Sequence, residues 1–118
     1  MRIFAIGLIG LAAVLATSKK PEGVEIQGHT VKLKAGYAFH RASPNKVYSY
    51  SIAGPGRNQI SGTYKCDCDK GSGSCNADLT KTTLTCTPAG SCTGCQLTVT
   101  IGKDGKLGML RPGGDGGL

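Results

Sequence analysis

Hydrophobic and polar residues alternate one by one along several short stretches of this chain. Over residues 30–35, Val31 and Leu33 share one side of an extended chain while lysines occupy the other. The same alternation recurs over residues 46–53 and is most regular over residues 96–101. Successive side chains of a β-strand point to opposite faces, so this period of two predicts three half-buried strands.

Residue types and turn signals indicate further extended segments. Residues 59–68 follow a Gly-Pro-Gly breaker, and the threonine-rich residues 78–87 favour a strand over a helix. The Asp-Gly pair within residues 103–106 predicts a hairpin turn, after which residues 107–110 return as a short edge strand. No helical periodicity accompanies these segments. The sequence therefore predicts an all-β fold, a small disulfide-stapled sandwich or open barrel of five to six short strands after an N-terminal signal segment.

Composition divides the chain into four segments. Residues 1–16 carry one positive charge, at Arg2, followed by an unbroken apolar run, which is the layout of a cleaved signal peptide. Residues 17–29 show little periodicity and are expected to form a flexible lead-in. The glycine-rich residues 111–118 are expected to form a disordered tail. A single cysteine-rich β domain is therefore expected over residues 30–110.

The apolar run also bears on the location of the protein. A helix that crosses the hydrocarbon core of a bilayer needs about 20 apolar residues, and the run over residues 3–16 is shorter than this. A secreted or periplasmic location is therefore predicted. The alternative is a protein anchored to the membrane through residues 3–16.

All the cysteines of the chain lie in one short segment, and the predicted export decides how they are interpreted. They are Cys66, Cys68, Cys75, Cys86, Cys92 and Cys95. An even number of clustered cysteines in a short exported chain indicates a disulfide framework. Cys66 and Cys68 share one face of an extended segment, where they cannot easily bond to each other, so each is expected to pair downstream. Six cysteines allow fifteen pairings, and the sequence leaves the choice among them open.

A metal site is the alternative use of these cysteines. Cys-x-Cys and Cys-x-x-Cys are both ligand spacings, and four thiolates would bind zinc or an iron–sulfur cluster. Asp67 and Asp69 flank the first pair and would raise the thiol pKa values by repulsion of like charge. Oxidation outside the cytosol also opposes free thiols. No metal ligand and no cofactor are therefore assigned from the sequence.

Charge is the remaining clue to partners. The formal net charge is +7, and most of the excess lies before residue 61. Candidate anion-binding residues in this half are Lys32, Lys34, Arg41 and Lys46. A positive surface outside the cell favours acidic proteins, anionic polysaccharide or lipid headgroups, and nucleic acid is not expected as a natural partner there.

Catalytic motifs are absent from the sequence. His29 and His40 stand in no recognisable motif, and no glycine loop of the phosphate-binding kind is present. The sequence therefore predicts a non-enzymatic secreted or periplasmic protein with a binding or structural role, including that of a subunit in a surface or membrane-associated assembly. One alternative is a cationic secreted effector of the toxin or antimicrobial kind, and another is a cysteine-ligated metal or iron–sulfur protein.

Overall fold

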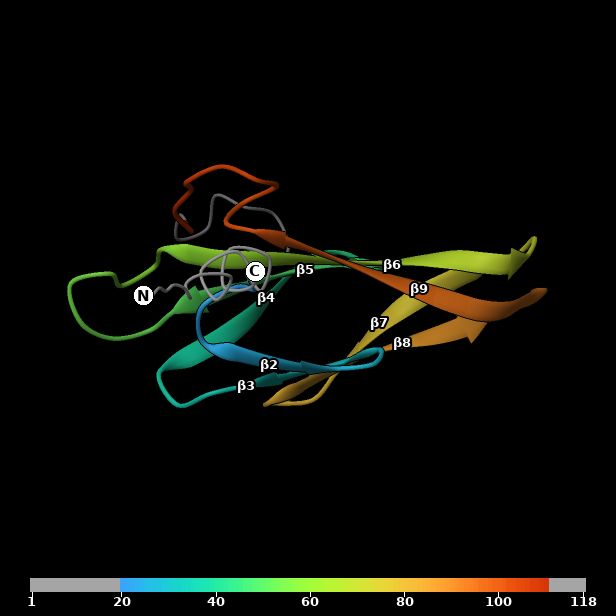
Figure 1. The fold of residues 1–118 in the computed structure, drawn as a ribbon, viewed down its shortest axis with the longest axis horizontal. Helices are drawn as coiled ribbons and strands as arrows, with labels where there is room; N and C mark the ends of the chain where they lie inside the picture. Colours follow the sequence, from blue (N-terminus) through green and yellow to red (C-terminus); the bar gives the residue numbers. More distant parts are fainter. Residues whose placement is uncertain (1–19, 111–118) are drawn as a thin grey trace, which may run out of the picture.

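The computed structural model describes residues 20–110, which form two four-stranded antiparallel β-sheets (Figure 1). The eight strands are β2 (Val24–Gln27), β3 (Thr30–Leu33), β4 (Tyr37–Ser43), β5 (Lys46–Ser51), β6 (Ile60–Gly71), β7 (Ser74–Leu79), β8 (Thr83–Ala89) and β9 (Cys92–Ile101). The all-β prediction is confirmed. The signal peptide expected at residues 1–16 and the tail expected at residues 111–118 lie outside the described residues.

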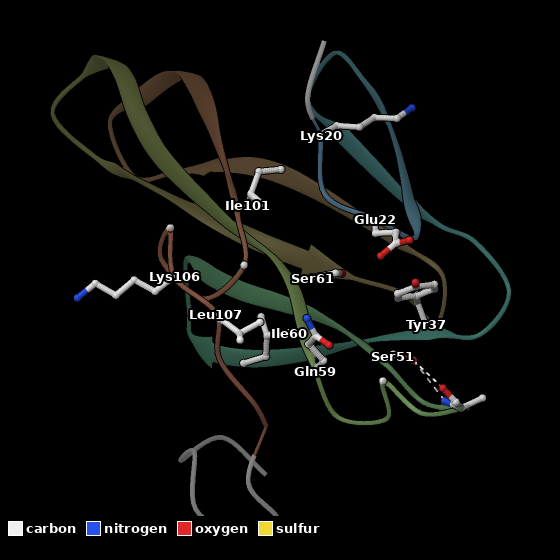
Figure 2. A pocket seen from close by; sticks show the side chains of 14 residues that line it. Lys20, Glu22, Tyr37, Ser51, Gln59, Ile60, Ser61, Ile101, Lys106 and Leu107 are labelled. Atoms are coloured by element: carbon white, nitrogen blue, oxygen red, sulfur yellow. Dashed lines mark hydrogen bonds between the residues drawn. The ribbon is translucent and has the colours of Figure 1, made fainter. Parts of the chain in front are cut away.

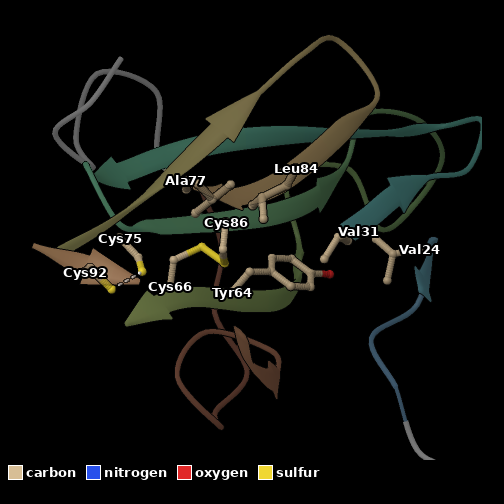
Figure 3. Packing of buried hydrophobic residues seen from close by; sticks show 10 residues of the cluster. Val24, Val31, Tyr64, Cys66, Cys75, Ala77, Leu84, Cys86 and Cys92 are labelled. Atoms are coloured by element: carbon tan, nitrogen blue, oxygen red, sulfur yellow. Dashed lines mark hydrogen bonds between the residues drawn. A yellow bond between two sulfur atoms is a disulfide. The ribbon is translucent and has the colours of Figure 1, made fainter. Parts of the chain in front are cut away.

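The two sheets share one buried core, so the fold is a sandwich. The first sheet has the strand order β2-β3-β8-β7, and the second has the order β4-β5-β6-β9. Buried side chains from both sheets meet between them, as Figure 3 shows. The core residues are Val24, Val31, Val47, Tyr64, Cys66, Cys75, Ala77, Leu84, Cys86 and Cys92. Three of the ten are valines and four are cysteines, so covalent bonds supply part of what a larger apolar core would otherwise contribute.

The structure has eight strands where five to six were expected, and one reason lies in residues 78–87. A turn divides this segment into the hairpin β7–β8. At the turn, the Thr80 hydroxyl accepts hydrogen bonds from the backbone N–H groups of Thr82 at 3.3 Å and Thr83 at 2.9 Å. Threonine hydroxyls offer the backbone an alternative to the sheet ladder. The threonines that indicated a strand therefore also supply the turn that interrupts it.

The expected flexible lead-in over residues 17–29 is the second correction, because it contains β2. Val24 is 1% exposed, and β2 pairs with β3 in a register that sets Val24 opposite Leu33. Gly28, with φ +60°, lies in the tight turn between the two strands. Its sequence Val-Glu-Ile-Gln does alternate apolar and polar residues, but the alternation covers only four residues between glycine-containing turns, and the pairing with β3 is what makes it a strand.

The segment after β9 is the third correction. The Asp-Gly turn is confirmed, because Asp104 and Gly105 both have positive φ, at 54° and 88°. Residues 107–110 form no regular edge strand. Met109 makes a single bridge with Gln59, and the Leu110 N–H donates to the Asn58 carbonyl at 2.6 Å. The segment thus folds against the start of β6 and buries Leu110 there.

Candidate binding cavity and the disulfide clamp

The six cysteines form three disulfides. In chain order, the first cysteine pairs with the fourth, the second with the fifth and the third with the sixth. The pairs are Cys66–Cys86, Cys68–Cys92 and Cys75–Cys95. The expectation that Cys66 and Cys68 both pair downstream is confirmed. Two of the bonds join the two sheets, and Cys68–Cys92 joins β6 to β9 within one sheet. We call these three bonds the disulfide clamp; Figure 3 shows its Cys66–Cys86 bond beside Tyr64.

The clamp also defines what metal binding would require. The sulfur atoms of Cys68, Cys75 and Cys92 lie within 4.8 Å of one another. Each of them is already bonded to another sulfur, and a disulfide offers no thiolate to a metal. The metal-binding alternative would therefore need the reduction of two bonds that hold β9 in place.

Two of the four candidate anion-binding residues have intramolecular partners for their charges, and two are exposed. Lys32 and Lys34 belong to the β3 region and are exposed. Arg41 lies on β4, where its guanidinium donates to the carbonyl groups of Ser43, Pro44 and Ala77. Arg41 thereby links β4 and its following turn to β7 of the other sheet. Its charge is engaged inside the molecule.

Lys46 is engaged in a similar way. Its ammonium group lies 2.9 Å from the Asp104 carboxylate and 5.7 Å from the centre of the Tyr48 ring. The hydrogen bond to Asp104 is the main cause that raises the lysine pKa above its usual 10.5. Anion binding stays a prediction, and Lys32 and Lys34 are the two members of the set with exposed side chains.

A cavity of about 570 Å³ lies at the other end of β6 and β9 from the disulfide clamp (Figure 2). Its apolar wall consists of Ile60, Ile101 and Leu107, and Tyr37 and Gln59 contribute from β4 and from the residue before β6. These positions come from distant parts of the chain. They meet because β4, β5, β6 and β9 all present the same end of the sheet to this space.

The polar groups that line the cavity differ in whether their charged ends face it. Figure 2 shows that the Glu22 carboxylate lies on the same side of the cavity as Tyr37, while the ammonium ends of Lys20 and Lys106 point outward. Gln59 and the hydroxyl of Ser61 add further hydrogen-bonding groups to the lining. The cavity therefore combines an apolar wall with several polar groups that can fix the orientation of a ligand.

The exposed large hydrophobic residues gather at this same end. Among residues 20–110 they are Ile52 at 47%, Ile101 at 46%, Leu107 at 81% and Met109 at 50% exposed. Ile101 and Leu107 line the cavity, Ile52 lies between the lining residues Ser51 and Ala53, and Met109 pairs with Gln59. Grouped exposed hydrophobic residues are typical of an interaction site, whereas isolated ones are ordinary.

The two histidines lie apart from this cavity. His40 is 3% exposed and stacks against the Tyr48 ring at 6.3 Å between ring centres. His29 lines a second cavity of about 470 Å³ beside the disulfide clamp, together with Asp69 and Lys70. They belong to different parts of the fold: His29 lies in the β2–β3 turn, and His40 lies on β4.

Comparison with known protein families, with curated proteins and with solved structures finds no match to this chain. Among residues 20–110, no helix is long and apolar enough to span a membrane. Three disulfides indicate an oxidising compartment.

Proposed function

We propose that this chain is an exported, non-enzymatic binding domain that holds an extended peptide segment of a partner protein in the cavity at the end of β6 and β9. The observation that supports the proposal is that the described residues gather their exposed large hydrophobic side chains around this one cavity. The three disulfides and the signal-like pattern of residues 1–16 support the export part of the proposal.

The chemistry of the lining favours a peptide as the ligand. Ile101 and Leu107 offer contact area to one or two apolar side chains. Glu22 accepts hydrogen bonds from backbone N–H groups, while the Gln59 amide donates to carbonyl oxygens and accepts from N–H groups. A peptide presents all three kinds of group within a few residues. The volume of about 570 Å³ also lies in the usual range for ligand sites, roughly 300–1,000 Å³.

The disulfide clamp suits this role because it fixes the two sheets relative to each other. β6 and β9 are joined covalently near one end, by Cys68–Cys92, and leave the other end to line the cavity. A site that is formed before the ligand arrives costs less conformational entropy on binding. The clamp therefore contributes to affinity without touching the ligand.

Selection of a random twelve-residue peptide library on the oxidised full-length chain tests the proposal. The selected peptides should share one or two bulky apolar residues. Their affinity, measured by fluorescence anisotropy, should fall by about tenfold or more when Leu107→Asp or Ile101→Asp places a charge on the apolar wall. Both side chains are exposed, so folding should persist in these variants.

The matched control is Thr82→Asp, which adds the same charge at the exposed β7–β8 turn. This variant should bind the selected peptides as tightly as the unaltered chain. If no peptide is enriched, or if the cavity variants bind as tightly as the control, the cavity is not a peptide site and the proposal is wrong.

A further inference from the structure

The sandwich has four sheet edges, and three of them are protected against pairing with another strand. β2 is only four residues long and carries Glu25. β7 is covered, because the Ala77 N–H donates to the Pro44 carbonyl at 2.9 Å and the Ala77 carbonyl accepts from Arg41. β4 ends in a register shift between Arg41 and Ser43, which interrupts its edge. Charges, bulges, short strands and covering loops are the usual means by which edges avoid association.

β9 is the edge without such protection. It is ten residues long, over Cys92–Ile101, and contains no charged residue and no proline. Two disulfides, Cys68–Cys92 and Cys75–Cys95, fix its first half to the rest of the fold. The strand is therefore held in the extended conformation that pairing requires, before any partner arrives.

The hydrogen-bonding pattern shows which backbone groups point to the open side. The Gly102 N–H donates to the Ser61 carbonyl at 2.9 Å, which continues the β6–β9 ladder beyond Ile101. Hydrogen-bonded positions alternate along an antiparallel pair. The even-numbered positions of β9 therefore bond to β6, and the N–H and C=O groups of Leu97 and Val99 point away from it. Among residues 20–110, no strand pairs with this side of β9.

We propose that β9 pairs antiparallel with β9 of a second copy of this chain and so forms a two-fold symmetric dimer with a continuous eight-stranded sheet. In an antiparallel pair of two copies centred on one residue, each odd-numbered position lies opposite another odd-numbered position. The outward-pointing backbone groups of the two copies therefore face each other. In the register centred on Thr98, Leu97 and Val99 of one copy exchange both backbone hydrogen bonds with Val99 and Leu97 of the other.

The charge pattern of β9 also permits self-pairing, whereas charged edge strands would oppose it. Each copy is strongly basic, with a net charge of +7, so association needs a contact strand that brings no like charges together. β9 meets that condition along its whole length. Opposed Thr98 side chains and opposed Leu97 and Val99 side chains are the kinds of cross-strand pairs that stabilise sheets.

Sedimentation equilibrium of the oxidised full-length chain, up to about 1 mM, tests the dimer. Thr98→Lys and Thr98→Glu each place two like charges opposite one another at the two-fold axis, and Thr98 is exposed in the single copy. Each variant should raise the dissociation constant by about tenfold or more. A mixture of the two variants should recover the affinity, because opposite charges then meet.

Thr85→Lys is the matched control, since Thr85 is an exposed threonine of β8, a strand with a neighbour on each side. It should leave the dissociation constant unchanged. Amide hydrogen exchange gives a second readout: the Leu97 and Val99 amides should exchange more slowly as the protein concentration rises. A chain that stays monomeric throughout, or a dimer that Thr98→Lys and Thr98→Glu leave unaffected, would overturn the proposal.

Discussion

Tyr64 is the residue on which the core depends most visibly. Its side chain is 0% exposed, and its hydroxyl lies 2.7 Å from that of Ser49. Its ring centre lies 6.2 Å from that of Phe39, with the two rings nearly perpendicular. The Ser49 hydroxyl lies in turn 2.8 Å from that of Ser61. A buried hydroxyl without a partner costs free energy, and this chain of three hydroxyls removes that cost. Burial raises the pKa of Tyr64 to about 12.

This shifted pKa predicts a loss of stability at high pH. In the unfolded chain the tyrosine pKa lies near 10, so the unfolded state releases the proton first as pH rises. The stabilisation is complete below pH 10 and disappears between about pH 10 and 12, amounting to about 3 kcal/mol for a shift of this size. Tyr64→Phe should remove this component, so the difference between the two proteins in free energy of unfolding should narrow from pH 8 to pH 11.

Urea unfolding at both pH values measures this difference. Lys46 also has a raised pKa and loses its stabilising charge at high pH, but it does so equally in both proteins, so the comparison isolates Tyr64. A pH dependence that is identical in the two proteins would show that Tyr64 does not carry it.

At the scale of the strand, a bulge in β6 decides where the side chains near the cavity point. Ser49 pairs with Gly62, but Tyr50 pairs with Ile60, so Ser61 is an extra residue in β6. Without the bulge, Ile60 and Tyr64 would share one face of the strand, because they lie four residues apart. Tyr64 instead lies in the main core, while Ile60 packs with Tyr48 and Leu110 in a second buried cluster. The extra residue turns β6 over and brings Ile60 to the cavity.

Arg41 links two strands of different sheets, and its removal should loosen that link. Arg41→Ala leaves the Ala77 carbonyl without its guanidinium donor, and the charge-assisted hydrogen bonds are lost. We expect the free energy of unfolding to fall by about 2–3 kcal/mol. The Ala77 amide, which donates to the Pro44 carbonyl, should exchange its hydrogen faster. Urea unfolding and amide exchange measure the two effects.

Arg57→Ala serves as the control for Arg41, because Arg57 is an exposed arginine of the loop before β6. It removes the same charge and should change stability by less than about 0.5 kcal/mol. If both variants lose the same stability, the effect comes from net charge and the link between the sheets contributes nothing.

At the scale of the whole molecule, the two ends of the sandwich have different roles. The three disulfides enclose overlapping loops, with sequence separations of 20, 24 and 20 residues. A loop of this length is worth roughly 3 kcal/mol in the chain-entropy account, and overlapping loops contribute less than their sum. The cavity end has no disulfide and exposes apolar side chains, so the cross-links that stabilise the fold and the proposed binding site lie at opposite ends.

Reduction should therefore unfold the domain. We expect a thiol reductant to abolish the cooperative thermal transition, because the apolar core is small. When one disulfide is removed at a time, Cys66→Ala/Cys86→Ala should lower the melting temperature of the domain more than Cys68→Ala/Cys92→Ala. The Cys66–Cys86 bond joins the two sheets through the core, whereas the Cys68–Cys92 bond lies within one sheet. Circular dichroism melts of the three proteins measure this order. Equal melting temperatures with and without reductant would show that the bonds are not structural.

The sequence by itself determined the features that depend on neighbouring residues. Alternation over residues 30–35, 46–53 and 96–101 predicted strands that the structure contains, and Asp104-Gly105 predicted a turn that it also contains. Side-chain alternation and turn conformation are local properties, so a short window holds the whole signal. The disulfide state followed in the same way from the number and clustering of the cysteines.

Only the tertiary structure decided the features that depend on distant contacts. The choice among fifteen cysteine pairings depends on the position of Cys66 of β6 across the core from Cys86 of β8, and on β9 lying beside β6. The bulge at Ser61 depends on the register between β5 and β6, and the cavity depends on five separate segments that end at one place. A short stretch of sequence does not determine the strand register or which strand ends meet, because both are fixed by packing between residues far apart in the chain.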